Sequence, residues 1–103
     1  MRSTPADSRD DLGVARVNVD EVEDILEGLR QLPELTEVKP AVFYVKRTPF
    51  LHFHESATTR GVDVREGKDW GERIELPVGR VSKTASAKFL REVERRLRTT
   101  LDS

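Results

Sequence analysis

The chain has 103 residues, of which 36% are apolar, 36% are charged and none is cysteine. This length suits one domain, and the lack of cysteine excludes a disulfide framework, a cysteine-ligated zinc finger and a thiol nucleophile. The formal net charge is −1, so no overall field draws the protein toward nucleic acid or an anionic membrane.

The chain is predicted to begin with a flexible tail, residues 1–17, followed by a single α+β domain over residues 18–103. The tail is rich in Ser, Thr, Pro, Asp and Arg and lacks apolar periodicity. No stretch is apolar enough for a signal peptide or a membrane span. We therefore expect a cytoplasmic protein of the small bacterial type, with no membrane partner.

An N-terminal helix is predicted from Asn18, because apolar residues then recur at spacings of three and four. The residues of this stripe are Val22, Ile25, Leu26, Leu29 and Leu32. Asn18 can cap the helix, and Glu21 can reach back to it as in a capping box. Pro33 is expected to end the helix.

Four short runs with a period of two follow a loop from Pro33 to Pro40, and the turns between them are short enough for hairpins. They predict an antiparallel meander of four strands, at about 41–46, 50–55, 61–66 and 72–76. From Ser82 a second amphipathic stripe predicts a C-terminal helix. The predicted fold is therefore α+β, with both helices packed on one face of the sheet.

Alternation along the strands assigns each residue to one face of the sheet. The core face is predicted to carry Phe43, Val45, Leu51, Phe53, Val62, Val64, Ile74 and Leu76. The opposite face, called the open face below, is predicted to carry Val42, Tyr44, Lys46, Phe50, His52, His54, Asp63, Arg65, Arg73 and Glu75. This assignment depends on the register of strand 50–55, since a shift by one residue would bury both histidines.

Both histidines of the chain lie in the strand 50–55, two residues apart. Their Cα atoms should be about 6.5–7 Å apart on one face of the sheet. Together with Asp63 on the neighbouring strand they could bind one zinc or iron ion, because such sites need a third ligand of this kind. One alternative is that the histidines are simply two polar rings on a half-exposed sheet face. Another is general acid–base catalysis by an imidazole that Asp63 orients.

Two arginines on the open face, Arg65 and Arg73, could converge on a small anionic ligand such as a carboxylate or phosphate. The plainer interpretation is a ladder of opposite charges with Asp63 and Glu75 that keeps the sheet soluble. Trp70 is flanked by glycines, and its side chain either packs over the core or is exposed and free to contact a ligand. Tyr44 adds an aromatic side chain to the same face.

Charge is uneven along the chain: residues 1–40 carry five bases and ten acids, whereas residues 77–103 carry seven bases and three acids. The last helix could therefore follow a phosphate backbone through Lys88, Arg91, Arg95 and Arg98. However, Glu92 precedes Arg96 and Glu94 precedes Arg98 by four, so pairing within the helix explains these charges. Nucleic acid is thus an improbable partner.

The function predicted first is a small interaction or ligand-binding module that uses the open face and forms a homodimer through it, without a cofactor. The second is an enzyme that uses His52 and His54, alone or with one divalent, zinc-like metal. The third is a nucleic-acid accessory protein that uses the last helix. The chain holds no motif for a nucleophile or a phosphate loop, so the sequence leaves enzymatic activity open.

The order of elements offers one family resemblance. A sheet followed by Trp70 and Ile74-x-Leu76, and then by a closing helix, is similar to the arrangement in small bacterial proteins of the YjbR type. The likeness is one of topology over about residues 18–101, and it implies no catalytic residue.

Overall fold

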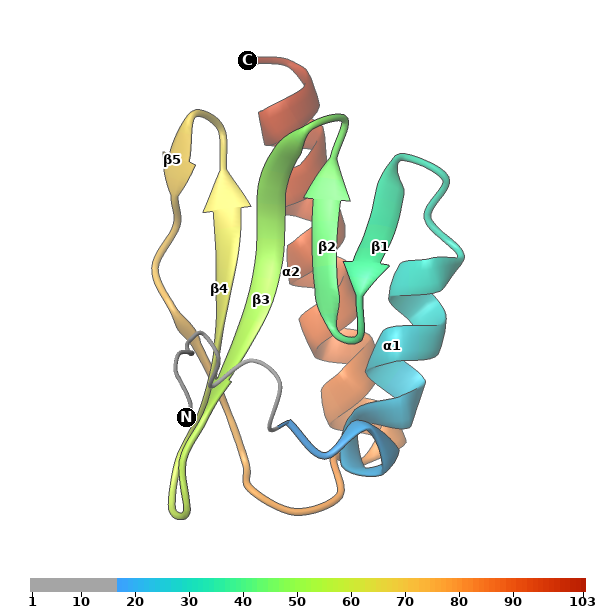
Figure 1. Cartoon of the computed structure of the whole chain (residues 1–103), viewed down its shortest axis with the longest axis vertical. Helices are drawn as coiled ribbons and strands as arrows, with labels where there is room; N and C mark the ends of the chain where they lie inside the picture. Colours follow the sequence, from blue (N-terminus) through green and yellow to red (C-terminus); the bar gives the residue numbers. More distant parts are fainter. Residues whose placement is uncertain (1–16) are drawn as a thin grey trace, which may run out of the picture.

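The structure, a computed structural model, describes residues 17–103 and shows an antiparallel sheet with two helices behind it (Figure 1). The predicted tail therefore lies outside the described residues except for Val17, which is buried in the core. The helical elements are the 3₁₀ helix η3 (Val19–Val22), α1 (Glu23–Arg30) and α2 (Lys83–Leu101). The strands are β1 (Leu35–Lys39), β2 (Val42–Val45), β3 (Thr48–Glu55), β4 (Arg60–Glu66), β5 (Asp69–Trp70) and β6 (Ile74–Leu76).

The strands follow one another as an antiparallel meander from β1 to β4, and β5 and β6 both pair with the far side of β4. Both helices cover the same face of the sheet, and α2 packs against β4 and α1. The predicted α+β class and the order helix, sheet, helix are confirmed. The sheet has two strands more than predicted, β1 and β5.

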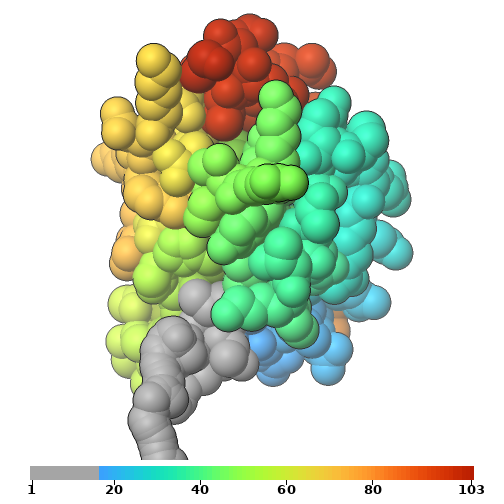
Figure 2. Space-filling model, turned by 45° about the horizontal axis from the view of Figure 1, so that its top comes forward, coloured from blue at the N-terminus to red at the C-terminus, as the bar shows by residue number. Residues whose placement is uncertain are grey.

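The two helical stripes and one face of the sheet form the core. From α1 and α2 the buried residues include Ile25, Leu29, Phe89 and Val93. The predicted core face is buried at Phe43, Val45, Leu51, Phe53, Val62 and Val64, and Ile74 and Leu76 are partly buried against it. The opposite face of the central strands is left free of helices, and Figure 2 shows part of that surface in green to yellow.

Phe50 is an exception to the predicted faces. It is completely buried, although alternation placed it on the open face. The cause is a β-bulge: Phe43 pairs with Leu51 while Tyr44 pairs with Pro49, so Phe50 is an extra residue in β3. A bulge turns one additional side chain toward the core without changing the faces that follow it. The histidines therefore keep their predicted face.

The helix ends show one further difference from prediction. Asn18 does cap the first helical turn, since its side chain accepts a hydrogen bond from the Asp20 N–H. The Glu21 carboxylate does not reach back to it but accepts a hydrogen bond from Arg60. Ser82, from which the second helix was predicted, caps α2 by accepting a hydrogen bond from the Ala85 N–H. Within residues 17–103 neither helix is long and apolar enough to cross a membrane.

Candidate metal site on the open sheet face

The centre of the open face is formed by two adjacent strands. His52 and His54 alternate with buried residues along β3, and Asp63 lies directly opposite His52 on β4. In such a cross-strand pair the Cβ atoms are about 4.5–5.5 Å apart, so side chains on one face meet. The structure thus brings together the three residues that the sequence singled out for a metal.

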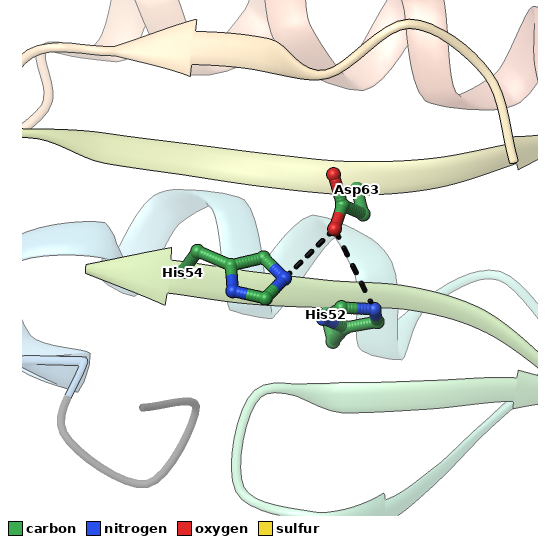
Figure 3. A group of neighbouring side chains, drawn as sticks. All are labelled: His52, His54 and Asp63. Atoms are coloured by element: carbon green, nitrogen blue, oxygen red, sulfur yellow. Dashed lines mark ion pairs between the residues drawn. The ribbon is translucent and has the colours of Figure 1, made fainter. Parts of the chain in front are cut away.

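One carboxylate oxygen lies between the two imidazole rings (Figure 3). Asp63 Oδ2 is 2.7 Å from His54 Nε2 and 3.7 Å from His52 Nε2. One ligand atom from each residue lies within 4.8 Å of the other two. All three side chains are partly shielded, with exposed fractions of 24% for His52, 39% for His54 and 19% for Asp63. The cluster is therefore compact and still reachable from solvent.

The hydrogen bonding of the two rings is incomplete. His54 Nε2 is close enough to Asp63 for a hydrogen bond, but the direction is unsuitable, and the buried nitrogen has no other partner among residues 17–103. His52 Nδ1 is likewise buried without a partner in this part of the chain. Buried polar atoms normally find partners. An unsatisfied imidazole nitrogen 2.7 Å from a carboxylate oxygen, as at His54 Nε2, is an arrangement that a cation would complete.

Asp63 is fixed from its other side by Arg73. The guanidinium donates from Nε to Oδ1 at 2.8 Å and from Nη2 to Oδ2 at 3.2 Å. Gly61 makes this possible, because a Cβ atom there would lie 2.6 Å from Arg73 Cδ. The stem of Arg73 thus crosses β4 where there is no side chain, and the resulting fork holds the carboxylate in place.

Electrostatics favours the protonation states that metal ligands require. Burial opposes ionisation of Asp63, but the hydrogen bonds and charge of Arg73 outweigh it and hold the pKa of Asp63 below its usual range. Burial, followed by repulsion from His54, lowers the pKa of His52. At neutral pH the site therefore holds a carboxylate and a neutral His52 imidazole, the forms that bind metals.

Trp70 extends the site along the sheet. Its ring stands edge-on to His52, with the ring centres 4.9 Å apart, and is 42% exposed. Arg65 lies over the Trp70 ring, with its guanidinium carbon 4.7 Å from the ring centre. Trp70 therefore neither folds over the core nor stands free in a loop. It forms a wall of the open face beside the histidines.

The structure does not bring Arg65 and Arg73 to a common partner. Arg65 donates to the carbonyl oxygens of Pro49 and Lys68, both at 2.8 Å, so it fixes a neighbouring turn. Tyr44 shares the open face and is half-buried, but its cross-strand partners are Thr36 and Pro49. Of the predicted ligand-binding residues, His52, His54, Asp63, Trp70 and Arg73 therefore form one connected group. Arg65 joins this group only through Trp70, and Tyr44 lies beside it.

The basic helix carries some of its charge in ion pairs. Arg95 contacts both Glu92 and Glu66, and Arg96 donates to Glu92 as the spacing predicted. Arg96 is almost fully buried and also donates to the carbonyl oxygens of Val64 and Glu72. These arginines hold α2 to the sheet, which is a structural role.

Sequence reasoning missed two features of the site. Gly61 was treated only as the start of a strand, although its missing side chain is what admits Arg73. The hydroxyl groups of Ser56 and Thr59 in the β3–β4 turn lie 2.7 Å apart and border a hollow beside His54. The Ser-Ala-Thr-Thr stretch signalled a turn, but its position next to the histidines follows only from the strand register.

Comparison of the chain with protein-family models, with curated proteins and with solved structures found no match. The topological likeness to YjbR-type proteins is therefore unsupported by a family match.

Proposed function

We propose that the open face is a ligand-binding surface centred on one divalent transition-metal ion, held by His52, His54 and Asp63. The observation that carries this proposal is the position of Asp63 Oδ2 between the imidazoles, with all three ligand atoms within 4.8 Å of one another. Around a tetrahedral zinc with 2.0–2.1 Å bonds, two ligand atoms are about 3.4 Å apart. Small rotations of the side chains would bring the three ligand atoms from within 4.8 Å of one another to about this separation.

The donor set selects the class of metal. Two imidazole nitrogens and one carboxylate oxygen suit zinc, iron or copper, whereas calcium and magnesium prefer sites made only of oxygen. Three protein ligands leave at least one coordination position for water or a ligand, as in catalytic rather than structural zinc sites.

This arrangement accommodates both functions that the sequence favoured. A metal with an open position binds a small ligand, which is the function of a binding module. The same metal can polarise a bound oxygen and lower the pKa of a bound water, which is the basis of metal-dependent hydrolysis. We place ligand binding first, because the described residues supply no nucleophile with its own base.

Two finer proposals concern assembly and location. A homodimer through the open face is supported by Tyr44, a half-buried aromatic residue on β2 beside the candidate site. A cytoplasmic location is supported by the cysteine-free composition, which fits a reducing compartment.

Trp70 provides a direct test of the metal proposal, because it is the one tryptophan of the chain and contacts His52. A paramagnetic ion bound to His52 should quench its fluorescence. We expect the untagged full-length chain to show saturable quenching by Co²⁺ at one equivalent. An Asp63→Asn variant should lose at least tenfold in affinity, while Asp69→Asn, an exposed aspartate on β5, should bind as the native chain does.

Two outcomes would overturn the proposal. One is quenching that fails to saturate near one equivalent, which indicates collisions with ions in solution. The other is equal quenching in Asp63→Asn and Asp69→Asn, which indicates that the carboxylate between the rings is not a ligand. Circular dichroism of both variants establishes that each has kept the fold.

A further inference from the structure

A hollow of about 320 Å³ opens beside the candidate metal site. Its lining includes His54 on β3, Arg73 before β6, and Ser56 and Thr59 of the β3–β4 turn. The hollow therefore touches one proposed metal ligand directly and reaches a second, Asp63, through Arg73. A molecule in it would be placed to complete the coordination of the metal.

Arg73 has unused hydrogen-bonding capacity toward this hollow. A guanidinium carries five N–H groups. Two of these are donated to Asp63, which leaves three, including both on Nη1. The side chain is 48% exposed, and the pKa of Arg73 is raised above its usual value by its hydrogen bond with Asp63. Arg73 can therefore hold Asp63 along one edge and an oxyanion along another.

Thr59 supplies a second donor. Ser56 Oγ accepts the backbone N–H groups of Thr58 at 3.4 Å and Thr59 at 3.2 Å. Its own hydrogen is then directed to Thr59 Oγ1, 2.7 Å away, because a hydroxyl offers two lone pairs and one hydrogen. The hydroxyl hydrogen of Thr59 is left to donate to a molecule in the hollow.

Two acidic residues also line the hollow and set a condition on binding. Glu55 accepts two hydrogen bonds from Arg60, so its charge is compensated. Glu75 is exposed and lies near Arg73, whose charge is already shared with Asp63. An anion entering without a metal would therefore meet uncompensated negative charge. A divalent cation on His52, His54 and Asp63 reverses the sign of this local charge.

We propose that the hollow binds a phosphate group, which completes the coordination of the metal while Arg73 and Thr59 hold its other oxygens. This inference rests on the proposed metal site. A phosphate group has enough oxygens to give each of the three anchors its own, whereas a carboxylate would have to share one of its two oxygens between two anchors. Binding is ordered, because the metal must be in place before the anion is attracted.

The test uses inorganic phosphate and the full-length chain loaded with one equivalent of Co²⁺, after metal loading has been measured separately by Trp70 fluorescence. Bound Co²⁺ should broaden the ³¹P signal of phosphate in a saturable manner. We expect metal-free protein to bind phosphate at least tenfold more weakly. Acetate, followed by its methyl ¹H signal, should also bind at least tenfold more weakly than phosphate.

Three variants test the side chains that hold the phosphate independently of the metal ligands. Arg73→Lys keeps a charge but loses the paired N–H donors of the guanidinium, and Gly61→Ala places a Cβ atom 2.6 Å from Arg73 Cδ, which displaces this side chain. Each should weaken phosphate binding at least tenfold at saturating metal. Thr59→Val should weaken it about threefold or more. The matched controls are Arg91→Lys, an exposed arginine on α2, and Thr58→Val in the same turn, and both should bind phosphate as the native chain does.

Each failure has its own meaning. Failure of Co²⁺ to bind overturns the metal site, and this inference with it. A metal-loaded protein that does not broaden the phosphate signal overturns the phosphate inference alone. Equal binding of acetate and phosphate contradicts the three-anchor arrangement. Unchanged phosphate binding in both Arg73→Lys and Gly61→Ala removes Arg73 from the site.

Discussion

Arg60 joins the segments that border the site, and its replacement gives the sharpest test of how the fold supports them. The side chain is completely buried at the start of β4. Its guanidinium donates to the carboxylates of Glu55 and Glu21, and to the carbonyl oxygens of Pro77 and Gly79 at 2.9 and 2.7 Å. One residue thus connects β3, η3 and the loop before α2.

Replacing Arg60 with Met preserves much of the apolar volume but removes every donor. Two carboxylates and two carbonyl oxygens then lose their partner, and Glu55 is only 14% exposed. Removing one member of a buried ion pair costs about 3–5 kcal/mol, because the charge left behind is uncompensated. We expect a loss of this size in the free energy of unfolding, a large part of the roughly 5–15 kcal/mol of a typical domain.

The assay is urea unfolding at pH 7, followed by circular dichroism. Arg91→Met on the exposed face of α2 is the matched control and should change the free energy of unfolding by less than about 0.5 kcal/mol. If Arg60→Met is too unstable to purify, Arg60→Lys provides the measurement, since an ammonium cannot reach all of these acceptors. A loss below about 1 kcal/mol, the value for a surface pair, would refute the reasoning.

Three further predictions test the bulge, the site and the assembly. Phe50→Ala should cost about 3–5 kcal/mol in urea unfolding, as for a core phenylalanine, and a cost below about 1 kcal/mol would place this side chain on the open face instead. The pKa of His52 is lowered in the folded chain, so the unfolded chain binds the proton first as the pH falls; metal-free protein should therefore lose stability below about pH 6.5. His52→Gln should remove that part of the pH dependence, and identical pH profiles for both proteins would contradict the shift. Light scattering should show a dimer that Tyr44→Glu converts to a monomer, and a native chain that is monomeric at every concentration would exclude an interface there.

The sequence was a good guide to the faces of the sheet because alternation is a local property. His52, His54 and Asp63 were placed on one face from parity alone, and the strand register puts Asp63 opposite His52. Phe50 was misplaced because a bulge is an irregularity of pairing between strands, which alternation within β3 cannot show. The bulge lies before the histidines, so it left their faces unchanged.

The two strands missing from the prediction have weak patterns of their own. β1 lies between two prolines, alternates only between half-buried and exposed residues, and has an irregularity near Val38. β5 has only two residues, Asp69 and Trp70, beside glycines that signalled a turn. Both are defined by pairing with a stronger neighbour, which periodicity within a single segment cannot reveal.

The partners of the two arginines on the open face could be predicted only in part: the expected pairing of opposite charges holds for Arg73 with Asp63 but not for Arg65. Arg65 and Arg73 share a face and a charge, yet one fixes backbone carbonyl groups and the other holds Asp63. What separates them is local space: Gly61 opens a path for Arg73, and Trp70 covers Arg65. Such steric relations arise only when strands distant in sequence are adjacent.

The most direct measurement of the central claim is a zinc titration of the untagged chain, followed by NMR of the histidine ring nitrogens and the Asp63 backbone amide. We predict that both imidazoles and Asp63 shift together and reach saturation at one zinc ion per chain, and that Asp63→Asn abolishes this concerted change. Histidine signals that stay in place at several equivalents of zinc, or that shift equally in Asp63→Asn, would contradict the claim that these three residues form a metal site.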